Sequence, residues 1–282
     1  PPTIIIGSTG SALAFGRDAD LITACPSHSM PKYAYHGRLS VVVPVKNEQD
    51  NIEPLVREIV VALHGRAEFE IIYVNDGSSD QTQQVLDTLK RELPMLRVIR
   101  HRHACGQSQA VTSGVRAAQH EWIATLDGDG QNDPADIPAL LAKLTDSTQP
   151  DNLELLAGWR AQRNDTFLRR LSSKVANGVR ARLLRDKTPD TGCGLKLFAR
   201  ESFLRLPNFD HMHRFLPALV MRGGGSVVSV PVHHRPRERG TSKYGVHNRL
   251  WVGIVDLFGV AWLQRRVRLP VIEPDSDLEI RS

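Results

Sequence analysis

Residues 122–130 read WIATLDGDG. The apolar run from Trp122 to Leu126 ends in two carboxylates, Asp127 and Asp129, and a glycine after each of them lets the chain turn sharply. A buried strand that ends in Asp-x-Asp places both carboxylates at its carboxyl end, where open α/β sheets bind their ligands. The pattern therefore predicts one strand of a parallel sheet that delivers two acidic groups to a binding site.

Two carboxylates this close repel each other unless a cation lies between them. Mg²⁺ and Mn²⁺ prefer oxygen ligands and often complete their coordination with phosphate oxygens. We expect a divalent cation at Asp127 and Asp129 that holds a nucleotide diphosphate. The alternative is a polar turn with solvated aspartates, because a bare Asp-x-Asp also arises by chance.

Short apolar runs alternate with helical patterns along the first half of the chain. Strands are expected at 39–45, 70–74, 96–100 and 122–126, and amphipathic helices follow the first three of them. Four successive units of this kind predict a parallel sheet with helices on both faces. Beyond Pro134 the alternation loosens, and we expect strands at 153–157, 195–198 and 226–232 and helices at 167–184 and 214–221. These elements are expected to complete the same domain.

Polar groups also follow the first two strands, as Asn47 and Glu48 after one and Asn75 and Asp76 after the next. Because the carboxyl ends of parallel strands meet at one edge of a sheet, these groups should lie near Asp127. Asp76 could accept hydrogen bonds from a base or ribose. Helix capping is the alternative for both Asp76 and Glu48.

The composition of the 282 residues is that of an ordinary globular protein with a net charge of +5. Basic residues concentrate at 160–185, 235–243 and 265–268, which favours anionic partners such as phosphorylated substrates, acidic lipid surfaces or nucleic acid. A nucleic-acid-binding module would interleave aromatic residues with the basic ones, and only 6% of residues are aromatic, so we expect no nucleic acid. Three cysteines without CxxC spacing suggest neither a disulfide framework nor a zinc site.

Three segments carry a resemblance to a known family. Residues 43–48 (VPVKNE), 74–80 (VNDGSSD) and 127–134 (DGDGQNDP) resemble the signature segments of family 2 glycosyltransferases with the GT-A fold, in particular the dolichol- or polyprenyl-phosphate sugar transferases. The resemblance extends over residues 39–266. It implies an α/β fold with a mixed, mainly parallel sheet flanked by helices. It also implies an inverting hexosyltransferase, similar to dolichyl-phosphate mannosyltransferases, that moves a sugar from a UDP- or GDP-linked donor to a polyprenyl (dolichol- or undecaprenyl-type) phosphate.

The resemblance assigns roles to individual residues of these segments. It implies a nucleotide pocket lined by Pro44, Asn47, Glu48, Asp76 and Asp127. It implies that Mg²⁺ or Mn²⁺ is bound by Asp127, Asp129 and Gln131.

The acceptor side of the site is implied by residues 157–160 and 169–177, which resemble the segment that holds the lipid phosphate. Arg160, Arg169 and Ser173 fall on the matching positions. The planar fork of donors on arginine suits a phosphate. The alternative is a solvated basic face of a helix.

Residues 190–196 (DTGCGLK) resemble the segment that places a carboxylate near the reacting sugar, here Asp190. In relatives with hydroxyl acceptors that group removes a proton. A phosphate acceptor has a second pKa of about 6 and is mostly dianionic at neutral pH, so Asp190 would orient the sugar or acceptor instead. A transferase that acts on a glycan hydroxyl, with Asp190 as base, remains the alternative function, and a turn aspartate is the structural one.

Residues 233–245 resemble the loop that closes over the donor. Arg237 and Lys243 match the pattern Arg-x-x-Gly-x-Ser-Lys and would neutralise the departing diphosphate. His233 and His234 are adjacent, so on a strand they point to opposite faces and a shared metal is not expected.

We divide the chain into a weakly ordered extension at 1–36, with Met30 as a candidate natural start, a catalytic domain at 37–247, an interfacial helix at 248–268 and a tail at 269–282. No secretory signal is recognised at the start. The apolar core of the helix, 250–263, is shorter than the roughly 20 residues needed to span a bilayer. Trp251, Trp262 and the flanking arginines suit a membrane interface, and a core or dimer helix is the alternative. We expect a peripheral protein on the cytoplasmic face of a membrane; the oligomeric state is left open.

Overall fold

The computed structural model describes residues 32–160, 178, 180–186, 188–236 and 246–268. Within this part of the chain, seven strands form one sheet in the order β3-β2-β1-β4-β6-β5-β7. The strands are β1 (Arg38–Val45), β2 (Glu68–Asp76), β3 (Leu96–His101), β4 (Trp122–Thr125), β5 (Leu153–Arg160), β6 (Lys196–Ala199) and β7 (Ser226–Val232).

Strand direction divides the sheet into two parts. Strands β1 to β4 run parallel to one another, as the four strand–helix units predict. Strand β6 runs antiparallel to both β4 and β5, and β7 pairs with β5 in parallel. The expectation of a mixed, mainly parallel sheet is therefore confirmed, and β6 marks the point where the direction of the chain reverses.

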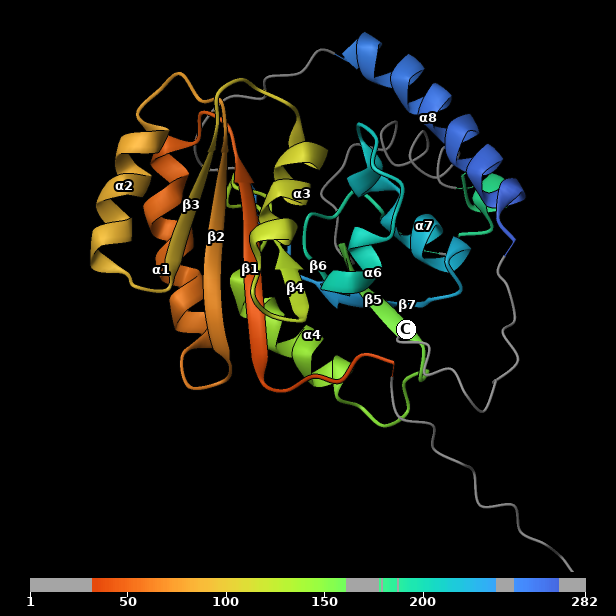
Figure 1. Cartoon of the computed structure of the whole chain (residues 1–282), viewed down its shortest axis with the longest axis horizontal. Helices are drawn as coiled ribbons and strands as arrows, with labels where there is room; N and C mark the ends of the chain where they lie inside the picture. The colour runs from red at the N-terminus through yellow and green to blue at the C-terminus, as the bar shows by residue number, and fades with distance from the viewer. Residues whose placement is uncertain (1–31, 161–177, 179, 187, 237–245, 269–282) are drawn as a thin grey trace, which may run out of the picture. The chain divides into compact units, whose positions relative to one another are not determined.

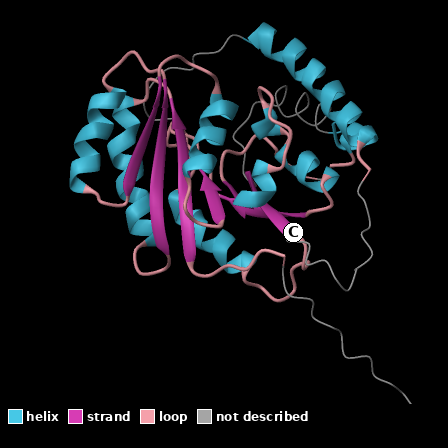
Figure 2. Ribbon diagram, in the orientation of Figure 1, coloured by secondary structure: helices cyan, strands magenta, loops and turns pink. Residues whose placement is uncertain are grey.

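Helices cover both faces of this sheet (Figures 1 and 2). The helical elements are α1 (Gln49–Leu63), α2 (Thr82–Glu92), α3 (Gln107–Ala117), η1 (Pro134–Asp136), α4 (Ile137–Leu144), α6 (Arg200–Leu204), η2 (Met212–Arg214), α7 (Leu216–Arg222) and α8 (Val246–Arg266). Residues 180–184 are helical as well. The sequence patterns predict α1, α2, α3, α7 and α8 but not the short helices α4 and α6.

Alternation along β1 separates two hydrophobic cores. Val41 and Val43 belong to the core shared with α1, α2 and α4, whereas Val42 belongs to the core shared with α3, α6, α7 and α8. Successive side chains of a strand point to opposite faces, so a continuous apolar run is what a strand covered on both sides requires. All three valines are fully buried.

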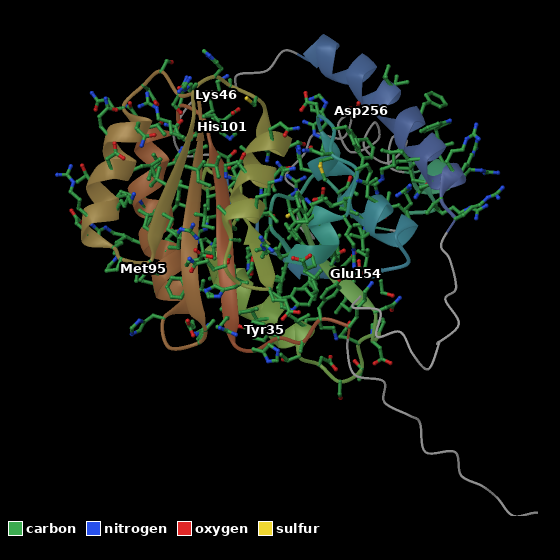
Figure 3. All side chains as sticks on the ribbon, viewed as in Figure 1. Tyr35, Lys46, Met95, His101, Glu154 and Asp256 are labelled. Atoms are coloured by element: carbon green, nitrogen blue, oxygen red, sulfur yellow. The ribbon has the colours of Figure 1, made fainter. Side chains whose placement is uncertain are left out.

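The two ends of the sheet differ in what they carry. Lys46 and His101 lie at the carboxyl end of the parallel strands, and Tyr35 and Met95 lie at the opposite end (Figure 3). Because β2, β1 and β4 are neighbours, the loops after these three strands lie side by side at the carboxyl end. This arrangement brings together the three polar strand ends singled out in the sequence.

Only the last residues of the expected N-terminal extension are described. The Lys32 amide donates to the carbonyl of Asp151 at 2.9 Å, and its ammonium pairs with Glu154 at 2.7 Å. Tyr33 and Tyr35 pack against the core that α1 and α2 share. Residues 32–36 thus contact the sheet domain, while residues 1–31 lie outside the described part.

Helix α8 has 21 residues and begins and ends two residues before the helix expected at 248–268. Val260 and Ala261 are buried against the domain. Val255, Phe258 and Trp262 are instead more than half exposed. Among the described residues, no helix combines the length and the apolar character needed to cross a bilayer.

Candidate active site

The acidic loop after β4 is held tightly against its neighbours. The Asp127 amide donates to Oδ1 of Asn132 at 3.0 Å, and the Gln131 amide donates to Oδ1 of Asp129 at 3.1 Å. A Cβ atom on Gly128 would lie 2.3 Å from Cγ1 of Val45, at the end of β1. The loop therefore needs glycine at this position in order to pass next to β1.

A second glycine brings the segment before β6 into contact with this loop. A Cβ atom on Gly194 would lie 2.3 Å from Cγ of Asp127 and 2.6 Å from Oδ1 of Asn132. The Thr125 hydroxyl also donates to the carbonyl of Gly194 at 2.8 Å. The segment 190–196 consequently packs against the acidic loop, so residues of both segments can contribute to one site.

A cavity of about 300 Å³ opens between these segments and the start of α3. Acidic, basic and amide side chains converge on it from five separate parts of the chain. Its polar lining includes Gln107, Asp127, Gln131, Arg160, Lys196 and His213, and Pro44 forms part of the wall. The cavity therefore has the size of a small-molecule site, and its mostly polar lining suits a charged ligand.

The negative charges of Asp127 and Asp129 are only partly balanced by the basic groups at this cavity. Burial and then the neighbouring charge of Asp129 raise the pKa of Asp127, although Lys196, Gln107 and Arg160 act in the opposite direction. Burial lowers the pKa of Lys196, whose ammonium donates to the carbonyl of Cys193. The acidic pair is thus a place where the fold favours additional positive charge.

Arg160 and Asp190 form a two-pronged ion pair beside the cavity. The Nε atom of Arg160 donates to Oδ2 of Asp190 at 2.6 Å, and its Nη2 atom donates to Oδ1 at 3.0 Å. The Gly192 amide also donates to Oδ1 at 3.2 Å. Burial works to lower the pKa of Arg160, but the hydrogen bonds and charge of Asp190 outweigh it and leave that pKa raised. The predicted acceptor-binding arginine and the predicted carboxylate are therefore one unit.

The loop after β1 is joined to the loop after β2 rather than to the cavity. Asn47 has a backbone φ of +53°, and its side-chain oxygen accepts from the Ser79 amide at 2.7 Å. Its own amide donates to the Ser78 hydroxyl at 2.9 Å. Glu48 accepts from the Asn51 side chain at 2.7 Å, at the start of α1. Both residues lie at the carboxyl end of the sheet but not among those that line the cavity.

The Asp76 carboxylate is hydrogen-bonded to other groups of the protein. Its carboxylate accepts from the amides of Cys105 and Gly106 at 2.7 and 2.9 Å and lies 2.8 Å from Nδ1 of His101. Asp76 therefore braces the start of α3, a capping role on a later helix than the one that follows it in sequence. The first residue of α3, Gln107, donates to Asp127 at 2.7 Å, so Asp76 supports the acidic loop indirectly.

The base of the expected closing loop is fixed beside the acidic loop. His234 pairs with Asn132 in an isolated antiparallel bridge, and its Nε2 atom lies 3.5 Å from Nε2 of Gln131. His233 contacts Asp136 instead, and its Nδ1 atom lies 2.7 Å from Oδ1 of Asp136. The two histidines thus face different partners, as their adjacency predicts. Arg237 and Lys243 lie outside the described residues, and so do Arg169 and Ser173.

Several polar groups of this site were not predicted from the sequence, among them Gln107, Asn132, Lys196 and His213. Nδ1 of His213 is hydrogen-bonded to the Ser108 hydroxyl at 2.7 Å, and burial lowers the pKa of His213 to about 3. Lys196 offered a visible signal, because it is a charged residue inside an otherwise apolar strand. Nothing in the local sequence marks His213, which reaches the cavity from a segment about 85 residues after the acidic loop.

Comparison with known proteins agrees with this arrangement. Residues 40–206 match the family Glycosyl transferase family 2. The chain is 37% identical over 232 residues to dodecaprenyl-phosphate galacturonate synthase of Rhizobium johnstonii, covering 80% of this chain and 67% of that protein. It is 32% identical over 211 residues to undecaprenyl-phosphate 4-deoxy-4-formamido-L-arabinose transferase of an Enterobacter species, covering 73% and 62%. The chain thus spans about two thirds of the length of these relatives.

Solved structures share the fold. A mannosyltransferase from Pyrobaculum calidifontis, in complex with GDP-Man and Mn²⁺, superposes with a TM-score of 0.61 at 21% identity and covers 86% of this chain and 67% of its own. Glucosyl-3-phosphoglycerate synthase from Mycobacterium tuberculosis, in complex with Mn²⁺, UDP and glucosyl-3-phosphoglycerate, superposes with a TM-score of 0.60 at 18% identity and covers 86% of this chain and 82% of its own. The sheet and its flanking helices are those of a GT-A glycosyltransferase, and together with the sequence matches they show that this chain belongs to glycosyl transferase family 2.

Proposed function

We propose that this chain transfers a sugar from a nucleotide diphosphate sugar to a polyprenyl phosphate, with inversion at the anomeric carbon. The observation that carries the proposal is the joint cavity, in which the acidic loop of Asp127 faces the Arg160–Asp190 unit. Relatives named for transfer to dodecaprenyl and undecaprenyl phosphate support the class of acceptor. The proposal therefore places the donor at the acidic loop and the acceptor phosphate toward Arg160.

The residues of the acidic loop fit a divalent cation. Two carboxylates one residue apart, with the pKa of Asp127 raised by burial and by Asp129, favour added positive charge. Asp127, Asp129 and Gln131 offer the oxygen ligands that Mg²⁺ and Mn²⁺ prefer. When bound, such an ion supplies positive charge for the diphosphate of the donor. The solved structures that contain Mn²⁺ make this ion the first candidate.

The side chains of this chain would position two anions for reaction. An oxygen of the acceptor phosphate attacks the anomeric carbon while the bond from that carbon to the donor diphosphate oxygen breaks, so the nucleoside diphosphate leaves. Arg160 is held in place by Asp190 and presents its remaining donors to phosphate, and Lys196 adds a second positive charge at the cavity. Bringing the two anions together is the main contribution of these groups. Arg169 and Ser173 for the acceptor, and Arg237 and Lys243 for the departing diphosphate, complete the proposed set.

The rival in which Asp190 acts as a base on a sugar hydroxyl is less well supported. The Asp190 carboxylate already accepts hydrogen bonds from the side chain and the amide of Arg160 and from the Gly192 amide, which favour its ionised form and occupy the oxygens that would take a proton. A phosphate acceptor requires no base near neutral pH, because its second pKa is about 6. Asp190 therefore serves best as a positioning residue.

The nature of the acceptor places the reaction at a membrane surface. A polyprenyl phosphate resides in the bilayer, and α8 presents Phe258 and Trp262 to solvent. Aromatic and basic residues on one helix suit the interface between lipid and water. We infer that the enzyme works as a peripheral membrane protein, with α8 near the lipid.

The test is a transfer assay with the purified full chain. The donors are labelled UDP- and GDP-linked hexoses, including GDP-mannose, and UDP-linked uronates; the acceptors are a polyprenyl phosphate and a panel of free glycans. The expected result is label that moves into an acid-labile lipid with one donor and only when Mn²⁺ or Mg²⁺ is present. Label found on glycan hydroxyls, with none on the lipid, would favour the rival.

A further inference from the structure

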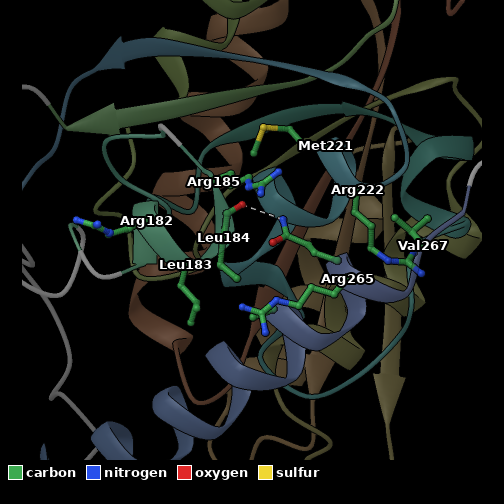
Figure 4. Close-up of a pocket in the computed structure, with 10 residues that line it drawn as sticks. Arg182, Leu183, Leu184, Arg185, Met221, Arg222, Arg265 and Val267 are labelled. Atoms are coloured by element: carbon green, nitrogen blue, oxygen red, sulfur yellow. Dashed lines mark hydrogen bonds between the residues drawn. The ribbon is translucent and has the colours of Figure 1, made fainter.

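A second cavity lies away from the active site and has a different character. Its volume is about 670 Å³, and the residues that line it come from 182–185, from the end of α7 and from the end of α8 (Figure 4). Among the described residues, it shares no lining residue with the cavity at the acidic loop. A ligand in this second cavity would therefore contact a different set of described side chains.

The walls of this cavity are fixed by hydrogen bonds between the three segments. The Gln264 side chain donates to the carbonyls of Leu184 and Ala218 at 2.9 and 3.2 Å, and the first of these bonds is the dashed line at Leu184 in Figure 4. The Arg222 Nε atom donates to the carbonyl of Leu263 at 3.0 Å. The cavity is thus preformed and does not depend on a ligand for its shape.

The charges around this cavity are all of one sign. Arg182, Arg185, Arg222 and Arg265 line it, and among the residues that the structure describes no aspartate or glutamate does. Within the described residues, Arg182, Arg185 and Arg265 have neither a hydrogen bond nor an ion pair from their side chains. Several guanidinium groups left without an acidic partner around one hollow form a site for an anion, and their planar donors match phosphate.

The backbone of Arg185 supports this interpretation. It has a φ of +53° directly after the helical residues 180–184. That position at a helix end is usually taken by glycine, because other residues are strained there. An arginine at a strained position, next to a hollow and without an acidic partner, is the kind of outlier that suggests a functional role.

An apolar face of α8 lies beside this cavity. Val255, Phe258 and Trp262 are spaced by three and four residues, so they share one face of the helix, and they are 67%, 62% and 57% exposed. Arg265 follows Trp262 by three residues and the cavity residue Ala261 by four, so it lies between that face and the cavity. Arg266 stacks over the Trp262 ring at 5.7 Å. A ligand phosphate in the cavity would therefore have an apolar surface next to it.

We propose that this arginine cavity binds the phosphate group of an anionic membrane phospholipid, while Phe258 and Trp262 enter the adjacent interface. A free phosphate ion would use the arginines but not the apolar face, whereas a phospholipid in a bilayer uses both. The inference deepens the proposed function and rests on it for the presence of a membrane. It would fix the orientation in which the active site meets the bilayer.

The test measures vesicle binding of the full chain by flotation, without donor or acceptor. Vesicles contain phosphatidylcholine alone or with phosphatidylglycerol. The cavity variant is Arg185→Gln with Arg265→Gln, and the control is Arg66→Gln with Arg91→Gln, which removes the same charge from exposed positions near α1 and α2. We expect the cavity variant to lose about 10-fold in affinity for phosphatidylglycerol vesicles and the control to lose less than about 2-fold. Arg185→Gly, which removes one of these two charges and suits the positive φ, should lose about 3-fold in affinity.

Equal losses in the cavity variant and the control would overturn the proposal, since they would indicate nonspecific attraction to the vesicle. Binding of inorganic phosphate to the cavity without any binding to vesicles would overturn it as well. Turnover with a short, water-soluble polyprenyl phosphate separates this inference from the proposed function. We expect unchanged kcat and KM in the cavity variant, and a raised KM would mean that the cavity is the acceptor site. Lipid binding by a wild-type protein that transfers no sugar would refute the proposed function but leave this inference standing.

Discussion

The acidic loop after β4 and the arginine cavity beside α8 are built in opposite ways. Asp127, Asp129 and Gln131 are neighbours in sequence, and hydrogen bonds within the loop and with Gln107 hold them in place. The cavity arginines come from three segments that are distant in sequence, and three of them lack partners among the described residues. A site made from one strand end is visible as a motif, whereas a site made by packing separate helices appears only in the fold. The comparison also predicts that the two sites can be damaged independently.

The largest effect is expected for Asp129→Asn. Loss of one carboxylate from the proposed cation site should lower kcat about 1,000-fold, in line with the removal of an electrostatic group from an active site. Binding to phosphatidylglycerol vesicles should stay at the wild-type level, because the arginine cavity shares no residue with this loop. Transfer assays and flotation on the same preparation check both halves. Near wild-type turnover would contradict the assignment of Asp129 to the cation site.

A smaller loss is expected for Asp190→Asn. The change leaves Arg160, which is largely buried, without its charged partner, so stability should fall and kcat should drop about 10-fold. The fall in rate below about pH 6 should persist, because it reflects protonation of the acceptor phosphate. If Asp190 is a base, kcat drops 100-fold or more and this dependence on pH disappears. The pH profile of kcat for the variant therefore separates positioning from base catalysis.

The contact between Gly194 and Asp127 can be tested with a matched pair of glycine variants. Gly194→Ala places a methyl group 2.3 Å from Cγ of Asp127, so the carboxylate must move. The affinity for Mn²⁺ with UDP or GDP should fall about 10-fold, and overpacking should cost about 1–3 kcal/mol of stability. In Gly192→Ala the nearest atoms, on Arg160 and Asp190, lie at 3.5 Å, an ordinary contact distance, so this variant should bind as the wild type does. Similar losses in both variants would contradict the claimed geometry.

The smallest effect concerns the stability of the domain between pH 7 and pH 5. Burial, with help from Lys196 and Arg214, lowers the pKa of His213 to about 3, whereas an unfolded histidine titrates near 6.5. Below pH 6.5 the unfolded chain therefore binds a proton that the folded protein refuses, and this group removes up to about 2 kcal/mol of stability by pH 5. The raised pKa of Asp127 has the opposite effect on stability, but this effect is the same in the wild type and in the histidine variants compared below.

Urea unfolding of wild type, His213→Gln and the exposed control His64→Gln measures this contribution. Only His213→Gln should flatten the dependence of stability on pH. An unchanged slope in that variant would mean that His213 titrates normally in the folded protein.

The parts that sequence predicts well are those set by local pattern. The run of β-branched residues in β1 and the exact match of the expected strand 226–232 to β7 follow from alternation and burial alone. The strand predicted at 195–198 is confirmed as β6, but the reversal of direction around it could not be inferred in this way, because pairing with β4 and β5 is decided by packing between distant segments. The short helix α6, of five residues, is below the length at which an amphipathic pattern is recognisable.

In the candidate site, too, local motifs are predictable from the sequence, whereas contacts between distant segments are not. The motif after β4 predicts where Asp127 and Gln131 lie, but not that Arg160 and Asp190 bind each other, since this pair joins residues thirty positions apart. Asp76 was expected to contact the nucleotide, and in the fold its carboxylate is used to brace the start of α3. Its role in nucleotide binding stays a prediction. For His213 and Lys196, only the folded chain reveals that they face the same cavity as Asp127.

The most direct test of the central claim is calorimetric titration of the full chain with UDP and with GDP, each in the presence and absence of Mn²⁺. We expect one of the two nucleotides to bind with a Kd below about 1 mM only when Mn²⁺ is present. We also expect Asp129→Asn to abolish this binding. Equal binding with and without Mn²⁺, or no binding of either nucleotide at millimolar concentrations, would contradict a cation-dependent donor site at the acidic loop.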